Sequence, residues 1–218
     1  MIESLEIVKK ESTEYETCLS WLIEHIRVKG SNSKKTIIYC RSIDAVSEMF
    51  CTLKDCLGKM AYVDGKIDSQ QDSKDRSINE FKKGDSHIRC IVATVTLGMG
   101  LDIRDVDLVM HIGCPKTLVS YWQDSGRCAR DGRAGYSLVL YDKFTLSLKT
   151  TEKEVAQLIL NKDEKCIRQE ILKFLTDDEI VAEAKPSEKC NGSCDLQCQC
   201  SMCSAVLSAE RNAHVKKI

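Results

Sequence analysis

The chain has 218 residues, of which 43% are hydrophobic, so it can form one sizeable core with an appendage, and its composition excludes a disordered chain. Charged residues make up 30% but nearly cancel to a net charge of -1, so no global field draws the chain onto nucleic acid, and any such contact must be local. No apolar run of about 18 residues is present, and the N-terminus lacks the apolar core of a signal peptide. A soluble intracellular protein without membrane contact is therefore expected.

The 13 cysteines fall into two groups by position. Seven are scattered singly along the first part of the chain and are expected to be small buried hydrophobes. The other six lie between Cys166 and Cys203 and need a separate explanation. A disulfide framework is not favoured, because the chain is larger than disulfide-rich secreted domains and carries no export signal.

The first half of the chain alternates helical and strand patterns. Before residue 35 we expect one amphipathic helix and then a polar link, GSNSKK. TIIYC at Thr36–Cys40 has the β-branched and aromatic residues of a buried strand. A helix should follow, capped by Ser42 or Asp44 and stopped by Gly58. The apolar positions of the first helix are Cys18, Leu19, Leu22, Ile23 and Ile26.

Continuous apolar runs predict the remaining strands, at residues 60–63, 90–94, 108–112 and 136–141. A further helix runs through Ile78 and Phe81 and ends at Gly84. Such strands alternating with helices indicate a parallel sheet covered on both faces, with functional loops at the strand ends. After Asp142 we expect no strand, but two helices, near 155–159 and 167–175, and then a cysteine-rich tail.

Two loops carry residues suited to chemistry. The first, TVTLGMGLD at residues 94–102, combines a hydroxyl, two glycines and a carboxylate at a strand end. These groups suit contacts with phosphate, ribose or a nucleic-acid backbone. The alternative is that a glycine-containing turn is more often only a turn. In QDSGRCARDGR, residues 123–133, three arginines spaced by three are expected to share one face of a helix start. Their guanidinium groups match phosphate oxygens, while the alternative interpretation is a solvated charged turn.

The order and wording of these segments resemble a known family. The resemblance is to helicase motifs IV, V and VI of RecQ-type DNA helicases and runs over about residues 35–142. The segments that carry it are IIYCRS, ATVTLGMG, SYWQDSGR and ARDG. The resemblance implies the second RecA-like domain of an ATP-dependent 3′–5′ DNA helicase. Its partners would be single-stranded DNA and duplex junctions, and its setting would be DNA repair or recombination in the nucleus.

The resemblance also implies roles on the nucleotide side. Arg130 would be the arginine finger that stabilises charge on the transferring phosphate, and Arg127 would be its nucleotide-sensing neighbour. Gln123 would help to couple the nucleotide and DNA sites. Asp102 would face the ribose of ATP, which binds with Mg²⁺.

On the DNA side, the family implies contacts from the loops that follow two strands. Thr94, Gly98 and Gly100 would sit near the hinge between nucleotide and DNA, the two glycines close to the nucleotide. Arg41 and Ser42 would contact the phosphates of the single strand. All of these roles come from the resemblance.

The sequence departs from the family pattern in three places. Val63 and Asp64 stand where the family usually has a histidine, so no site is assigned there. Cys128 and Ala129 replace the usual Ala-Gly pair, which leaves the arginines in register. Lys74 stands where many relatives carry arginine. These departures weaken the details of DNA contact more than the ATP-sensing assignment.

The late cysteines predict a zinc site in a small helical subdomain, because four thiolates can hold zinc tetrahedrally and stabilise a subdomain with little core. The pattern also resembles the zinc subdomain that follows the RecQ motor. Cys200 and Cys203 could replace Cys194 or Cys198, and His214 is interpreted as a tail residue rather than a ligand. The proposed ligands are Cys166, Cys190, Cys194 and Cys198.

The sequence contains no G-x-x-x-x-G-K-[ST] phosphate loop and no acidic DEAH-like motif. ATP would therefore be bound in a cleft shared with a preceding RecA-like domain, in cis or in trans, and this chain alone should neither hydrolyse ATP nor unwind DNA. Two alternatives stay open, a non-catalytic module that binds DNA or a helicase partner, and a degenerate copy. The expected domains are residues 1–34 (helix and link), 35–142 (RecA-like), 143–206 (zinc-binding) and 207–218 (tail).

Overall fold

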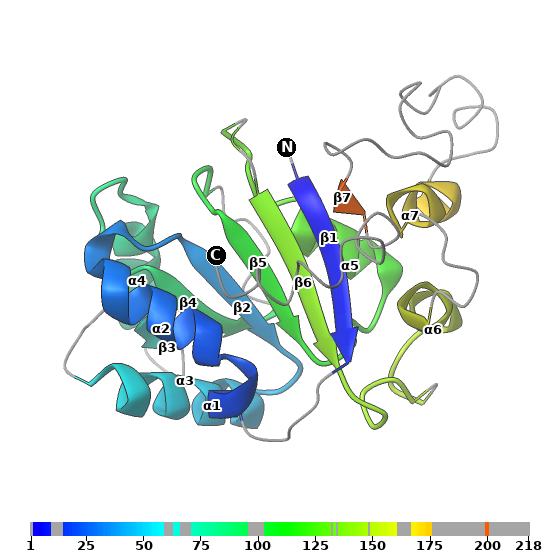
Figure 1. Cartoon of the computed structure of the whole chain (residues 1–218), viewed down its shortest axis with the longest axis horizontal. Coiled ribbons are helices and arrows are strands. Elements are labelled where there is room, and N and C mark those ends of the chain that lie inside the picture. The colour runs from blue at the N-terminus through cyan, green and yellow to red at the C-terminus, as the bar shows by residue number, and fades with distance from the viewer. Residues whose placement is uncertain are drawn as a thin grey trace.

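The computed structural model describes residues 2–9, 15–58, 63–65, 71–95, 103–131, 133, 135–147, 149–160, 167–175 and 199–200. Its described strands form one parallel sheet in the order β3-β4-β2-β5-β6-β1-β7 (Figure 1). No helix among these residues is both long and apolar enough to span a bilayer. The strands are β1 (Ile2–Lys9), β2 (Thr36–Cys40), β3 (Val63–Gly65), β4 (Cys90–Thr94), β5 (Leu108–Ile112), β6 (Gly135–Tyr141) and β7 (Gln199–Cys200).

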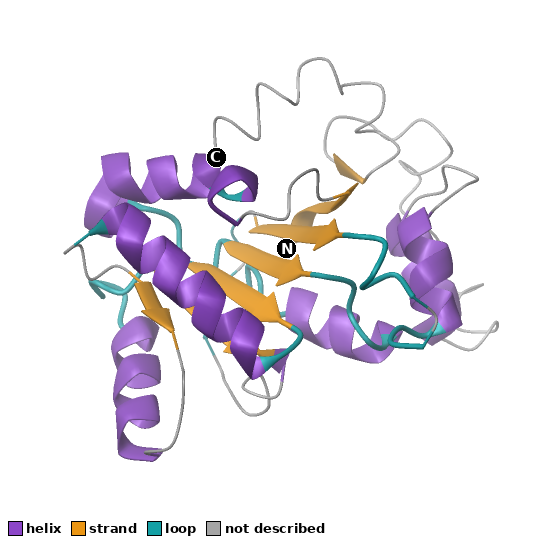
Figure 2. Cartoon of the chain, turned by 90° about the horizontal axis from the view of Figure 1, so that it is seen from below, coloured by secondary structure: helices purple, strands orange, loops and turns teal. Residues whose placement is uncertain are grey.

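Helices lie on both sides of the strands (Figure 2). Alternate residues of a strand point to opposite faces, so Ile38 of β2 packs with α2 and α3, while Ile37 packs against the end of α4. A third group of buried side chains brings Val139 of β6 together with α5, α6 and α7. The helices are α1 (Tyr15–Cys18), α2 (Ser20–Lys29), α3 (Ile43–Leu57), α4 (Gln71–Lys82), α5 (Leu118–Ser125), α6 (Lys153–Leu160) and α7 (Ile167–Leu175), and a 3-10 turn covers Gly30–Asn32.

The expected parallel sheet with helices on both faces is confirmed. The strands at 36–40, 90–94 and 108–112 have the expected bounds. Ser42 caps α3, because its hydroxyl accepts a hydrogen bond of 3.2 Å from Ala45 N. Gly58 ends that helix with a φ of 64°, as its position predicts. Of the strand expected at 60–63, only residue 63 is among the described residues, where β3 begins.

Two strands were not predicted. β1 lies before the N-terminal helices and pairs in parallel with β6, while β7 adds to the outer side of β1. Both depend on partners more than 100 positions away, and a local hydrophobic pattern carries no information about such pairing. α4 begins at Gln71, seven positions before Ile78, the first of the two apolar residues through which this helix was expected to run.

The scattered cysteines are free thiols, and Cys40, Cys90, Cys114 and Cys128 are buried as expected. The interpretation as a buried hydrophobe is wrong for Cys51, which is exposed on α3. The side chain at this position lies on the outer face of an amphipathic helix, where burial depends on the tertiary arrangement rather than on residue type.

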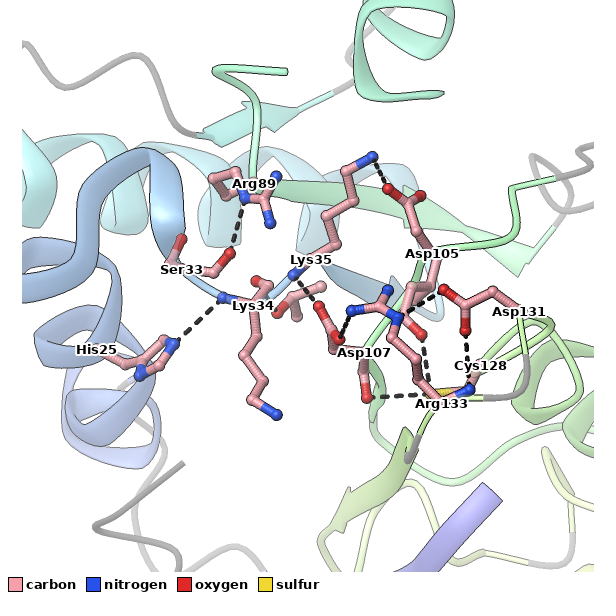
Figure 3. A network of polar contacts seen from close by, with 12 residues as sticks. His25, Ser33, Lys34, Lys35, Arg89, Asp105, Asp107, Cys128, Asp131 and Arg133 are labelled. Atoms are coloured by element: carbon pink, nitrogen blue, oxygen red, sulfur yellow. Dashed lines mark hydrogen bonds and ion pairs between the residues drawn. The ribbon is translucent and has the colours of Figure 1, made fainter. Parts of the chain in front are cut away.

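A buried lysine lies in the segment expected to be a polar link. The Lys35 side chain is 1% exposed. Its ammonium donates to Phe81 O at 2.7 Å, Lys83 O at 2.8 Å and Asp105 Oδ2 at 2.6 Å, the last of which is drawn in Figure 3. All three donor positions of the ammonium are thereby used, which offsets the cost of its burial. The link thus joins the start of β2 to the end of α4 and to the segment that precedes β5.

Removing this ammonium should destabilise the fold. Lys35→Met would leave two carbonyl groups and a carboxylate without their partner, and we expect the free energy of unfolding to fall by about 3 kcal/mol. The control is Lys82→Met, on the exposed end of α4, which should change it by less than about 0.5 kcal/mol. Urea denaturation followed by circular dichroism measures both. Equal stability of the two variants would contradict this role of Lys35.

Candidate functional site

Loops that follow β2, β5 and β6 meet at the carboxyl edge of the sheet, and Arg41 joins them. Its Nη1 donates to Thr145 O at 3.0 Å and to Thr151 Oγ1 at 3.1 Å, and its Nη2 donates to Thr150 O. Partial burial lowers the pKa of Arg41 below its usual value. Gly113 has a φ of 89°, and a Cβ there would lie 2.9 Å from Thr145 Cγ2, so only glycine fits this crossing.

The predicted DNA contacts come together at this edge. Thr94 ends β4 directly beside Cys40 of β2, so it lies next to Arg41 and Ser42. Ser42 uses its hydroxyl as the cap of α3. A small pocket opens between the ends of β2, β4 and β5, and Arg41 and Lys116 are its two cationic side chains. Its lining includes Tyr39, Arg41, Val95, His111, Cys114 and Lys116.

The three other residues predicted for the glycine loop, Gly98, Gly100 and Asp102, lie outside the described residues. The described chain resumes at Ile103, and residues 103–107 lead into β5. The expected ribose contact of Asp102 is therefore still a prediction.

The arginine-bearing segment is a turn at the end of a helix, so the prediction of a helix start is wrong. α5 ends at Ser125, with Gln123 exposed in its last turn. Arg127 and Arg130 lie in the turn over 126–131 that follows. Ala129 has a φ of 55°, a left-handed conformation that prevents the helix from continuing through the arginines.

Backbone hydrogen bonds fix this arginine turn, residues 126–131, to the segment that precedes β5. Ala129 N donates to Val106 O at 2.9 Å, and Asp131 N donates to Arg104 O at 3.2 Å. The thiol of Cys128 donates to Asp107 O at 3.1 Å. Burial raises the pKa of Cys128 to about 12, so the thiol acts as a neutral donor. The arginine turn thus lies at the opposite edge of the sheet from Arg41.

The third arginine of the segment closes the polar network in Figure 3. Arg133 Nε donates to Asp131 Oδ2 at 2.6 Å, and its Nη1 donates to Asp107 Oδ1 at 3.1 Å. The other oxygen of Asp107 accepts from Lys35 N at 2.8 Å. Arg133 therefore holds the end of the arginine turn against the starts of β2 and β5.

The two arginines with predicted nucleotide roles differ in exposure. The Arg127 side chain is 11% exposed, and its Nε lies 3.6 Å from Asp124 Oδ1. Arg130 is exposed, and its Nε donates to Gly126 O at 3.0 Å. Burial, with a smaller effect of Asp124, raises the pKa of Tyr39 above its usual value, and the positive charges of Arg127 and Arg130 oppose this shift.

A buried histidine and carboxylate were missed from the sequence. His111 Nε2 lies 3.4 Å from Asp124 Oδ2, and the two residues are 3% and 4% exposed. The imidazole lies between the rings of Tyr39 and Tyr121, with centroids 5.3 and 5.4 Å away. A single histidine in an apolar strand gives no functional signal, because most such residues serve only packing.

The described residues contain no group of three or more His, Cys, Asp or Glu side chains that could hold a metal ion. The predicted zinc ligands Cys166, Cys190, Cys194 and Cys198 lie outside the described residues, as does Cys203. Cys200 is described, in β7, where its backbone pairs with Leu5 of β1. The ligand set thus stays a prediction.

The left-handed conformation of Ala129 gives a test of the turn. Ala129→Gly removes the strain, but glycine loses more conformational entropy on folding, which offsets part of the gain. We therefore expect the free energy of unfolding to stay within about 0.5 kcal/mol of the parent value or to rise. Ala129→Val should lower it by about 2 kcal/mol or more, because a β-branched residue is disfavoured at this φ. Urea titrations measure both changes. A valine variant as stable as the parent would argue against the left-handed turn.

Comparisons with known proteins identify the family and the fold. The family described as helicase conserved C-terminal domain matches residues 17–132. Similar curated proteins include the RecQ-like DNA helicase BLM of Xenopus laevis, 36% identical over 126 residues, which are 57% of this chain and 8% of that protein. The ATP-dependent helicase wrn-1 of Caenorhabditis elegans is 31% identical over 146 residues, covering 65% of this chain and 13% of the relative.

A further relative, the ATP-dependent DNA helicase Q1 of Pongo abelii, is 30% identical over 177 residues, covering 79% of this chain and 26% of the relative. The chain thus spans between 8% and 26% of the length of these three proteins.

Among solved structures, domain 2 of the DEAD-box helicase Mss116p bound to an RNA duplex matches with a TM-score of 0.55 and 23% identity, covering 84% of this chain and 73% of that one. The Escherichia coli DEAD-box protein SrmB matches with a TM-score of 0.52 and 23% identity, covering 67% of this chain and 82% of its own. At these identities the likeness shows the fold alone, a RecA-like parallel sheet with helices.

Proposed function

Because the chain belongs to the family of helicase conserved C-terminal domains and resembles RecQ-like helicases, we propose that it supplies the second motor half of an ATP-dependent 3′–5′ DNA helicase. The observation that carries this proposal is the arginine turn, which is held by backbone hydrogen bonds to 104–106 and presents Arg130 at the surface. The proposed setting is DNA repair or recombination in the nucleus.

The chemical role of the arginine turn is to neutralise charge on a phosphate. Arg130 is exposed and would reach the phosphate that leaves ATP, while Arg127 is held by Asp124 nearer the sheet. A guanidinium fixed in place stabilises the developing charge without reorganisation during the reaction. The phosphates and Mg²⁺ would be held by a preceding RecA-like domain, with Gly98, Gly100 and Asp102 of this chain on the ribose side.

The carboxyl edge would hold the single strand. Arg41, Ser42 and Thr94 lie together there, and Lys116 adds a further positive charge to the pocket lining. Contacts of this kind bind the sugar–phosphate backbone and carry no base specificity. Binding would require Arg41 to exchange or share its bonds to the 145–151 loop, so this loop would respond to DNA.

The arginine assignment is testable once a phosphate-loop domain is present. We expect the chain, joined to the first motor domain of a RecQ-like relative, to hydrolyse ATP in a DNA-stimulated manner. Arg130→Ala should lower kcat by about 10³-fold or more, because the transition state loses its cation. A steady-state ATPase assay measures this.

The matched control is Arg27→Ala, an exposed arginine on α2 that pairs with Glu24. Its kcat should equal that of the parent. An Arg130→Ala variant with kcat within about tenfold of the parent would contradict the role of Arg130 as the finger.

We also propose that residues 143–206 form a zinc-binding subdomain. The support is the cluster of cysteines in the sequence, since thiolates are preferred zinc ligands. Four of them, Cys166, Cys190, Cys194 and Cys198, would hold the ion and fix the part of the subdomain that follows α7, while α6 and α7 pack on α5 and β6. A structural zinc of this kind takes no part in ATP hydrolysis.

Metal analysis of the purified chain tests this proposal. We expect about one zinc per chain, lost on Cys166→Ser, because a tetrahedral site needs all four ligands. The matched control is Cys51→Ser, since Cys51 is exposed on α3 in the RecA-like part. If the parent chain carries no zinc after purification and reconstitution with zinc salts, the proposed subdomain is wrong.

A further inference from the structure

Phe144 carries an exposed aromatic ring at the carboxyl edge of the sheet. It is 82% exposed, more than any other large hydrophobic residue in the described part of the chain. It lies in the loop that follows β6, and Figure 1 shows this loop at the arrowhead end of the strands. The ring forgoes the stabilisation that burial gives an aromatic side chain, so packing within the fold does not account for it.

Hydrogen bonds fix the backbone on both sides of this ring. Thr145 N donates to Asp142 Oδ1 at 2.7 Å, and Leu146 N donates to Asp142 O at 3.0 Å. Arg41 Nη1 donates to Thr145 O at 3.0 Å and ties the loop to the end of β2. A ring presented on a backbone that is already ordered loses less conformational entropy when a ligand binds it.

Two further exposed apolar side chains follow neighbouring strands at the same edge. Ile43, at the start of α3 after β2, is 64% exposed, and Val119, in the first turn of α5 after β5, is 53% exposed. The start of α5 is bonded to the loop between β6 and α6, because Leu118 N donates to Glu152 Oε2 at 3.1 Å. Three exposed apolar side chains thus belong to one connected set of loops.

Exposed lysines accompany the ring. Lys143 directly precedes it, Lys149 lies farther along the same loop, and Lys116 follows β5. The two carboxylates of this loop, Asp142 and Glu152, both accept hydrogen bonds from backbone N–H groups. An apolar protein partner would bury the lysine ammonium groups without a counter-charge, which is costly. A nucleic-acid single strand matches both features, since its bases have flat apolar faces and its phosphates are negative.

We propose that Phe144 is a stacking platform for a base of single-stranded DNA, and that the lysines beside it attract the neighbouring phosphates. The inference rests on the proposed function and adds a base contact to the backbone contacts of this edge. The base lies against the outer surface of the loop, so the contact needs no cavity. Every base has a face that can stack, so the platform accepts any sequence.

Two oligonucleotides of equal length separate stacking from charge. One is oligothymidylate, and the other is built from abasic residues, which keep the phosphates but have no bases. Fluorescence anisotropy of the labelled strands measures the Kd of the whole chain for each, at one salt concentration. We expect Phe144→Ala to raise the Kd for oligothymidylate about tenfold and to leave the Kd for the abasic strand within about twofold of the parent value.

Two further substitutions at this position test whether the contact is aromatic. Phe144→Leu keeps an apolar side chain but has no ring, so it should lose as much affinity for oligothymidylate as Phe144→Ala does. Phe144→Trp should keep the affinity of the parent, since its ring also stacks.

Control variants separate the ring from its surroundings. Phe174→Ala removes the exposed phenylalanine of α7, which is 47% exposed, and should change neither Kd. Lys143→Ala should weaken the binding of both strands alike, because its charge acts on phosphates.

The outcomes separate this inference from the proposed function. If the parent binds both strands with the same Kd, or if Phe144→Leu binds oligothymidylate as tightly as the parent, the stacking platform is wrong while the DNA edge stands. The same holds if Phe144→Ala weakens both strands equally or neither. If the parent binds neither strand, the proposed DNA edge is wrong, and the platform fails with it. The comparison of the two strands on the parent needs no variant.

Discussion

Asp107 is the point on which the arrangement of the site depends. Its N donates to Lys35 O at 2.9 Å, its carbonyl accepts from Tyr136 N at 2.9 Å, and its carboxylate accepts from Lys35 N and from Arg133. The starts of β2, β5 and β6 are thereby held in register by one residue that is 7% exposed. Since a buried carboxylate is costly unless it is fully hydrogen-bonded, this arrangement leaves little freedom to the arginine turn that packs on it.

This constraint separates the two proposed sites in space. The arginine turn is fixed at the amino edge of the sheet, while Arg41, Ser42 and Thr94 lie at the carboxyl edge. In parallel sheets, connecting helices run from one edge to the other, and α5 does so here. His111 of β5 and Asp124 of α5 are in contact where this helix crosses the sheet.

The sequence predicted the central strands well, because buried parallel strands are continuous apolar runs, as in TIIYC and LVMHI. The arginines lie in a turn after α5 rather than at a helix start, and their nucleotide roles stay a prediction. Three features could not be predicted locally. β1 pairs with a strand that lies far along the chain. The buried ammonium of Lys35 is hydrogen-bonded to carbonyl groups 46 and 48 positions away. The left-handed conformation of Ala129 ends the helical path, so the arginines lie in a turn. Each depends on tertiary contacts rather than on residue type.

The central claim is that the chain presents Arg130 and Arg127 in a preformed turn to a nucleotide bound mainly by another domain. A crystal structure of the chain joined to a phosphate-loop motor domain, with a non-hydrolysable ATP analogue, tests this most directly. We expect the guanidinium of Arg130 to lie within hydrogen-bond distance of the terminal phosphate, with the bonds from Ala129 N to Val106 O and from Asp131 N to Arg104 O retained. An Arg130 turned away from the nucleotide, or an arginine turn detached from 104–106, would contradict it.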